Sequence, residues 1–366
     1  MICIAGIAYY GFKFTKQTPK KADISKDVKQ EKRLKGDEVS SDKIKTLSFG
    51  SDVNDEKDII SISDDKVVYR KNNVELKIAD RKTKKADVIE GFNLNTEYNN
   101  ACSNESYVVL IEEVNDSNSG ENNPNKSLMK IFNVKSGKSS ILDSKEALGS
   151  EDTSNNKRSE FGPCIKIKDN KIIYTLFTNN GVYIMNYDID NKKVGLIYSI
   201  PYTDRDLIGL YSFDIDLKNG YMIIGSKSSD KKNGTVNLLT LLDIKNKKKT
   251  LLAKSSQEIS TSIYYPNVAF QIKDKIHMYN IEKKKDDFVL QCGKNPCNVE
   301  IKDDYVIWND DKLSIYSIKD KKLYETANGW FKDDPNYNGE KMTSGDIVFW
   351  KDNDNIKYIN LKDIEG

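Results

Sequence analysis

The sequence predicts an all-β fold: a seven-bladed β-propeller of four-stranded antiparallel blades, with six or eight blades as the alternatives. Three observations predict it. An apolar triplet recurs seven times, each triplet is followed by a second alternating strand with a characteristic polar ending, and successive triplets lie roughly 37 to 65 residues apart. This spacing brackets the period of propeller blades that carry loop insertions, whereas a β-helical solenoid needs a far shorter period.

The triplet consists of residues that favour strands, and it ends mostly in an aromatic residue. Most copies follow a polar turn that contains Asp, Asn or Gly, which is a hairpin signal. The seven copies are Val67-Val68-Tyr69, Val108-Val109-Leu110, Ile172-Ile173-Tyr174, Met222-Ile223-Ile224, Val268-Ala269-Phe270, Val306-Ile307-Trp308 and Ile347-Val348-Phe349.

The strand after each triplet ends in a large apolar residue, a polar residue and an aliphatic residue. A lysine-rich turn and an outer strand such as Thr250-Leu251-Leu252-Ala253 then follow, so that each unit holds four strands. The clear copies of this ending are Phe132-Asn133-Val134, Tyr187-Asp188-Ile189, Leu242-Asp243-Ile244, Tyr279-Asn280-Ile281, Tyr316-Ser317-Ile318 and Ile359-Asn360-Leu361.

The last unit has no outer strand of its own, because the chain ends soon after Leu361. Residues 43–49 precede the first unit and resemble the outer strands elsewhere. Since an exposed strand edge is a liability that ring closure removes, we expect residues 43–49 to complete the seventh blade.

These repeats resemble the TolB-like propellers and related extracytoplasmic propellers of low-GC Gram-positive bacteria of the clostridial type. The resemblance covers about residues 43–366 and rests on the hairpin triplets and on the strand endings followed by lysine-rich turns. It implies a propeller displayed on the cell envelope. It does not imply one activity, because such propellers range from binding scaffolds to accessory domains of enzymes.

The charge of the chain is balanced. It has 58 basic and 56 acidic residues, a net charge of +2, and signs that alternate along the chain, so nucleic acid is not an expected partner. The arginines are few and scattered, which limits bidentate recognition of phosphates and carboxylates. They are Arg33, Arg70, Arg81, Arg158 and Arg205.

The sequence predicts three regions. Residues 1–14 are apolar except for Lys13 and are too short to cross a bilayer alone, so we interpret them as a partial membrane anchor or signal segment. The alternative for this stretch is a buried N-terminal strand. Residues 15–42 have the composition of a charged, flexible spacer. Residues 43–366 form a single propeller domain, which this order of segments places outside the cytoplasm, tethered to the membrane by its N-terminus.

The five cysteines fit that location, where thiols become oxidised. Cys3 lies in the apolar segment, and the four cysteines of the body allow three pairings into two disulfides. Cys292 and Cys297 are the disulfide candidate, because their bond would close a small loop. We expect no metal site and no cofactor: His277 is the only histidine and is expected to be structural within a strand, and no glycine-rich phosphate loop is present.

The connections predict where a ligand binds. In a four-stranded blade, the turn between the second and third strands and the crossover to the next blade emerge on one face. Six long segments fall on that face: 91–101, 116–125, 143–163, 201–209, 226–233 and 328–340. Loops on a rigid scaffold commonly carry function. The candidate binding residues on two of these crossovers are Trp330, Phe331 and Tyr337, and Tyr202, Arg205 and Asp206.

We expect a non-catalytic, envelope-facing binding or scaffold propeller that recognises a protein, a peptide or a surface glycan. The alternative is a metal-dependent hydrolase or lyase whose carboxylates line the central channel, with Asp214 and Asp216 or Asp352 and Asp354 as paired carboxylates. The second pair is more typical of an ordinary hairpin turn. A further alternative is a sensory module controlled by a membrane-linked partner.

Overall fold

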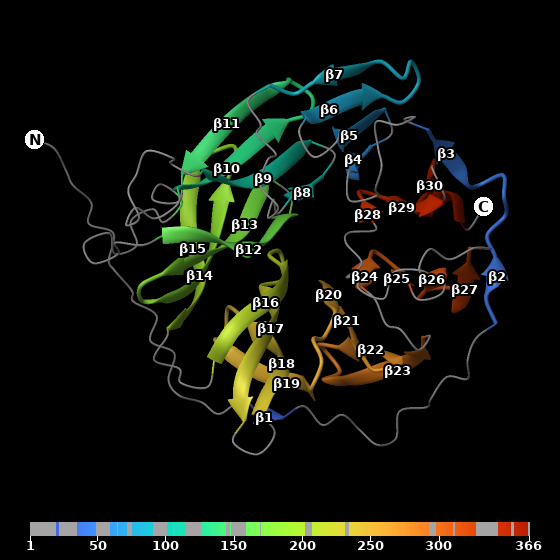
Figure 1. Cartoon of the computed structure of the whole chain (residues 1–366). Helices are drawn as coiled ribbons and strands as arrows, with labels where there is room; N and C mark the ends of the chain where they lie inside the picture. The colour runs from blue at the N-terminus through green and yellow to red at the C-terminus, as the bar shows by residue number, and fades with distance from the viewer. Residues whose placement is uncertain are drawn as a thin grey trace, which may run out of the picture.

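The computed structural model is almost entirely β and forms a ring of seven small sheets (Figure 1). It describes residues 20–21, 35–48, 59–63, 65–71, 75–90, 101–104, 106–114, 126–143, 147, 159–168, 170–201, 207–230, 234–292, 298–309, 312–326, 343–352 and 355–364.

The first four blades follow chain order, each as an antiparallel sheet of four consecutive strands. Blade one is β4 (Ile59–Ile62), β5 (Lys66–Lys71), β6 (Glu75–Asp80) and β7 (Ala86–Val88); blade two is β8 (Ala101–Ser103), β9 (Tyr107–Val114), β10 (Lys126–Asn133) and β11 (Lys138–Asp143). Blade three is β12 (Ser159–Lys168), β13 (Lys171–Thr178), β14 (Gly181–Asp188) and β15 (Lys193–Pro201); blade four is β16 (Leu207–Asp216), β17 (Tyr221–Asp230), β18 (Gly234–Asp243) and β19 (Lys248–Ser255).

The last three blades repeat the pattern, except that the seventh takes its outer strand from the start of the chain. Blade five is β20 (Thr261–Tyr264), β21 (Asn267–Ile272), β22 (Lys275–Asn280) and β23 (Lys285–Gln291); blade six is β24 (Val299–Lys302), β25 (Tyr305–Asn309), β26 (Leu313–Ser317) and β27 (Lys322–Glu325). Blade seven is β28 (Thr343–Ser344), β29 (Ile347–Asp352), β30 (Asn355–Asn360) and β3 (Lys45–Leu47).

The ring closes where the sequence predicts it. Strand β3 pairs antiparallel with β30, with Lys45 opposite Tyr358 and Leu47 opposite Ile356. The predicted closure of the seventh blade by the segment 43–49 is therefore confirmed at Lys45–Leu47, and so is the count of seven blades.

Two further short strands precede β3 and run parallel to outer strands. Strand β1 (Lys20–Lys21) pairs with β19 of blade four, and β2 (Asp37–Glu38) pairs with β27 of blade six. The N–H of Val39 extends the second pairing by donating to the carbonyl of Glu325 at 2.9 Å. The described part of the expected spacer therefore contacts the propeller before the chain enters blade seven.

The core is divided into seven apolar clusters, one at each contact between neighbouring blades. The cluster between blades seven and one joins Phe349 and Ile356 to Val67 and Tyr69, so residues from the two ends of the propeller share one core. This division explains how a chain with 37% hydrophobic residues stabilises a large ring: each cluster needs only sparse apolar residues at alternating positions.

The recurring triplet lies on the second strand of every blade, where both faces of the strand are buried. In blade three, Ile172 and Tyr174 pack toward blade two, whereas Ile173 packs toward blade four. Blade six follows the same rule, with Val306 and Trp308 on one side and Ile307 on the other. Because successive strand residues point to opposite faces, a strand between two interfaces requires three apolar residues in a row.

The chain departs from strand geometry after β30. Residues Leu361–Ile364 form the short helix α1, and both Leu361 and Ile364 are buried in the cluster between blades six and seven. Within the described residues, no helix has the length and apolar character needed to cross a bilayer.

The close pairing of β14 with β15 leaves no room for a side chain at Gly181. A Cβ atom there would lie 2.9 Å from the Cα of Pro201 and closer still to the carbonyl oxygen of Ile200. We expect Gly181→Ala to lower the free energy of unfolding by about 1–3 kcal/mol, because backbone atoms must shift. Chemical denaturation measures the change. Gly209→Ala is the matched control, since a Cβ at Gly209 meets nothing within 4 Å; equal stability of the two variants would contradict this packing.

Candidate functional site

The two faces of the ring differ in the length of their connections. We call the face that carries the crossovers between blades, and the turns between second and third strands, the loop face; the opposite side is the turn face. On the turn face, residues 303–304 join β24 to β25 and residues 318–321 join β26 to β27. On the loop face, residues 326–342 join β27 to β28. The asymmetry expected from the sequence is present in the strand bounds of the described residues.

The candidate binding residues from the sequence lie outside the described residues. All six belong to two crossovers whose flanking strands end at the loop face: β15 ends at Pro201 and β16 begins at Leu207, while β27 ends at Glu325 and β28 begins at Thr343. The six are Tyr202, Arg205, Asp206, Trp330, Phe331 and Tyr337. Their role in binding stays a prediction.

One segment expected to be a long loop is largely strand. Residues 226–230 belong to β17 and pair with residues 234–238 of β18, with Ser228 opposite Val236. The sequence expectation failed there because small polar residues interrupt the apolar pattern, although Ser226 and Ser228 are in fact buried. Blade four therefore projects a long hairpin on the loop face.

The disulfide candidate is only half described. Cys292 is buried at the end of β23, and Gln271 donates a hydrogen bond from Nε2 to its sulfur at 3.1 Å. Cys297 lies outside the described residues. The Cys292–Cys297 bond therefore remains a prediction.

The innermost strands bring together a group of charged side chains that the sequence did not connect. Asp214 on β16 is 1% exposed. Its Oδ1 lies 3.4 Å from the ammonium groups of both Lys166 and Lys168 on β12, and accepts a hydrogen bond from the N–H of Ile215 at 2.9 Å. The lysines themselves remain 40% and 37% exposed. Blade three thus neutralises a carboxylate buried in blade four.

The other oxygen of Asp214 joins blade four to blade five. Oδ2 accepts hydrogen bonds from the hydroxyl of Ser262 and from the N–H of Ile263, both at 3.0 Å. Two residues further along β16, Asp216 Oδ2 accepts from the N–H of Tyr265 at 3.3 Å. The paired carboxylates that the sequence offered as a metal or catalytic pair therefore bind the backbone of the neighbouring innermost strand.

This environment favours the charged forms of both Asp214 and Lys166. Burial alone would raise the pKa of Asp214, but the two lysines and the N–H donors outweigh it and hold the pKa well below its ordinary value. Burial would likewise lower the pKa of Lys166, but the negative charges of Asp214 and Glu300 outweigh it and raise the pKa. Glu300 lies on β24 of blade six, across the ring from blade three in Figure 1, and its negative charge still acts on Lys166.

Side chains on other innermost strands bond to neighbouring strands in the same way. Ser260 Oγ accepts from the N–H of Val299 at 2.8 Å, joining blades five and six. Ser344 Oγ accepts from the N–H of Ile62 at 3.1 Å, joining blades seven and one. Thr343 donates its hydroxyl hydrogen to Glu300, joining blades seven and six. Polar residues near the axis therefore bond blade to blade.

The described residues contain no group of three or more His, Cys, Asp and Glu side chains arranged to hold a metal ion. His277 lies within β22, as expected from its alternating strand. Its ring stacks on Phe270 with centroids 5.1 Å apart, and its Nδ1 lies 2.9 Å from Asp286 Oδ2. The geometry of His277 is that of a packed side chain inside a blade.

No protein-family model matches the chain, and no curated protein is significantly similar to it in sequence. The fold is similar to part of the tricorn protease, with a TM-score of 0.53 and 12% identity over 90% of this chain and 35% of the protease chain. It is also similar to Sqt1 of Saccharomyces cerevisiae, with a TM-score of 0.47 and 10% identity over 82% of each chain. For BamB of Moraxella catarrhalis the TM-score is 0.44, with 10% identity over 86% of this chain and 98% of BamB.

The likeness to the tricorn protease, at this low identity, supports the propeller fold alone. Together, the closed ring and the unequal faces fit a binding or scaffold role, because a rigid frame that presents loops on one side is suited to recognition.

Because the pKa of Asp214 is depressed in the folded state, the free energy of unfolding depends on pH in the acidic range. The charged carboxylate stabilises the folded state above its ordinary pKa of 3.8, and this contribution is lost as the pH falls below that value through the folded-state pKa. We expect Asp214→Asn to lower the free energy of unfolding at neutral pH by about 1–3 kcal/mol, because two lysines lose their counter-charge. The deficit relative to the wild type should shrink in acid.

Denaturant unfolding at neutral pH and well below pH 3.8 measures both effects. Asp87→Asn, on the exposed outer strand β7, is the control and should change stability by less than about 0.5 kcal/mol at either pH. A deficit for Asp214→Asn that is the same at both pH values would contradict the ion pairs with Lys166 and Lys168.

Proposed function

We propose that the protein is a non-catalytic binding propeller that recognises a protein, a peptide or a surface glycan through its loop face. We also propose that the chain is related to the TolB-like propellers. The propeller then lies outside the cytoplasm and is tethered to the membrane by the N-terminal segment. Two features of the sequence support that place: residues 1–14 are almost entirely apolar, and a charged segment separates them from the first blade.

The unequal length of the connections on the two faces is the observation that carries the proposal. Tight turns on one side contribute stability and little surface variety, whereas the crossovers on the other side are long enough to present side chains to a ligand. In propellers all crossovers between blades emerge on one face, so their residues can act together although they are distant in sequence.

The composition of two crossovers indicates what the loop face recognises. Trp330, Phe331 and Tyr337 fall in one, and Tyr202 and Arg205 in another. Aromatic rings supply apolar area against a sugar ring or a peptide side chain, and the neighbouring polar groups fix the orientation of the ligand. Glycans and peptides share this requirement.

The carboxylates described near the axis do not favour the alternative of a metal-dependent hydrolase or lyase. Both oxygens of Asp214 are engaged by protein donors and lysines, and Glu300 accepts a hydrogen bond from Thr343. A divalent metal would have to displace these partners from the groups that join the blades.

The proposed function predicts that Trp330→Ala weakens ligand binding by about tenfold or more, because truncation of a central aromatic anchor typically costs that much. Wild type and variant are immobilised, incubated with cell-envelope extract, and compared by quantitative mass spectrometry of what each retains. Asp87→Ala, on the exposed outer strand β7, is the control and should retain the same partners as the wild type. Equal recovery by wild type and Trp330→Ala, or no enrichment over empty resin, would contradict the proposal.

A further inference from the structure

The turns between third and fourth strands repeat one sequence and one geometry around the ring. We call these six-residue segments the lysine turns. Each begins with Asp, Asn or Ser, continues with Ile, Val or Arg, and ends with lysine in every case. They are residues 80–85, 133–138, 188–193, 243–248, 280–285 and 317–322, in blades one to six.

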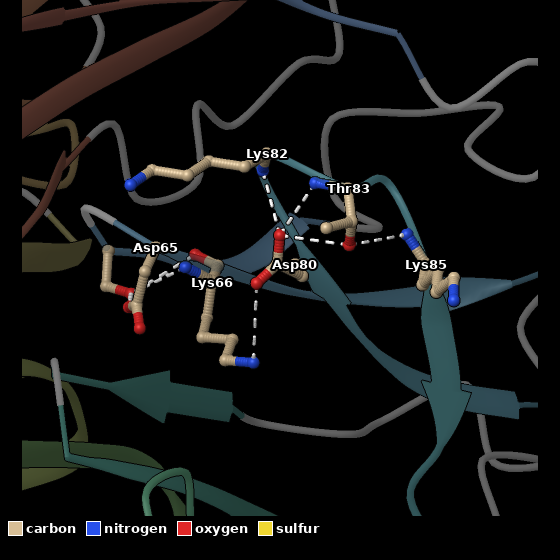
Figure 2. Close-up of polar contacts among 7 residues, drawn as sticks. Asp65, Lys66, Asp80, Lys82, Thr83 and Lys85 are labelled. Carbon is tan, nitrogen blue, oxygen red and sulfur yellow. Dashed lines mark hydrogen bonds and ion pairs between the residues drawn. The ribbon is translucent and has the colours of Figure 1, made fainter.

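The first residue of each lysine turn caps the turn with its side chain. In blade one, Asp80 Oδ1 accepts from the N–H groups of Lys82 at 3.0 Å and Thr83 at 2.7 Å, as Figure 2 shows. The equivalent oxygens of the other blades accept from a backbone N–H three residues on, at 2.8–3.2 Å: Asn133, Asp188, Asp243, Asn280 and Ser317. An oxygen-bearing side chain that bonds the following backbone is the basis of a fixed turn.

The second residue of each turn anchors it to the turn between the first and second strands of the same blade. The N–H of Ile189 donates to the carbonyl of Asn170 at 3.0 Å, and that of Ile318 donates to Asp304 at 2.7 Å. The same bond recurs at Arg81, Val134, Ile244 and Ile281. Each lysine turn is therefore held in a defined position on the turn face.

The fifth residue has a left-handed backbone in all six turns. Blade two has Gly137 there, with φ of 68°, as expected for a residue that adopts this conformation without strain. The other five blades place lysine at this position, with φ of 51–59°: Lys84, Lys192, Lys247, Lys284 and Lys321. A lysine in this conformation is strained relative to glycine, so five blades carry the same local strain.

The lysines at the fifth and sixth positions are exposed. They recur in successive blades around the turn face, and three acidic residues of these turns, Asp80, Asp188 and Asp243, bond back into the turn as caps. Asp190, Glu282 and Asp320 are exposed beside the lysines. Blades one and three to six thus present paired ammonium groups at these two positions, and blade two presents Lys138 alone, on a side of the molecule where the described connections are tight turns. The six lysine turns together contain 17 basic and 6 acidic residues, so these turns are basic although the net charge of the chain is only +2.

We propose that this ring of lysine turns docks the turn face onto a bilayer that contains anionic lipid headgroups. A planar array of fixed charges matches a planar anionic surface, which all the turns meet at once, whereas a linear polyanion would follow only part of the ring. Each lysine ammonium group near such a surface is attracted by the negative surface potential and adds to the binding free energy. In this orientation the loop face points away from the bilayer and stays open to a ligand.

The test uses the full chain and vesicles of phosphatidylcholine alone or mixed with phosphatidylglycerol. The turn-face variant carries Lys192→Gly, Lys247→Gly and Lys284→Gly. It should fold, because Gly137 is the natural residue at this position in blade two. Vesicle sedimentation should show wild-type binding that depends on phosphatidylglycerol and weakens with salt, and a loss of about tenfold or more in the variant.

The matched control removes three lysines from the loop-face ends of blades four and five: Lys254→Gln, Lys273→Gly and Lys275→Gln. Lys273 also has a left-handed backbone, with φ of 56°, so the control reproduces the full charge change and the relief of strain at one position. The control should bind vesicles as the wild type does. All variants keep residues 1–14, so insertion of that apolar segment affects each equally.

Three results would overturn the proposal: equal binding by the wild type and the turn-face variant, equal weakening in the turn-face and loop-face variants, or binding that does not depend on phosphatidylglycerol. Tighter binding of the wild type to duplex DNA than to the mixed vesicles at the same salt concentration would also overturn it, because a nucleic acid would then be the preferred polyanion.

Discussion

The structure depends on how the innermost strands satisfy their open edges. Each of the seven sheets ends at the ring axis in a strand with no further strand to pair with, and unpaired backbone groups in the interior are costly. Side chains from the neighbouring blade supply the missing partners: Asp214, Ser260 and Ser344 accept N–H groups of the next blade. These contacts fix the blades relative to one another, and the apolar clusters behind them can then pack.

The connections at the two ends of each strand differ between the turn face and the loop face. At the turn face, capped turns return the chain within a few residues and hold each lysine turn to its own blade. At the loop face, the chain must cross to the next blade, and the crossovers are free to vary in length. A single repeating unit therefore produces one uniform side of lysine-rich turns and one irregular side, and the two proposals concern these two surfaces.

The blade repeat and the closure of the ring were predictable from the sequence, because a strand buried on both faces requires runs such as Ile172-Ile173-Tyr174 and because an unpaired last strand requires a partner. The contacts near the axis were not. Asp214 and Asp216 resemble a metal-binding pair in sequence, and only the neighbouring backbone of blade five shows them to be acceptors between blades. The extended hairpin of blade four and helix α1 also depend on packing partners that are distant in sequence.

The central claim is a ring closed by the pairing of β3 with β30, and hydrogen–deuterium exchange tests it most directly. In the full chain, the amides of residues 355–360 should exchange slowly. In a chain that lacks residues 1–48, these residues and β4 of blade one should exchange faster, because the seventh blade loses its outer strand, while β13 of blade three keeps its protection. Unchanged protection of residues 355–360 in the shortened chain would contradict the closed ring.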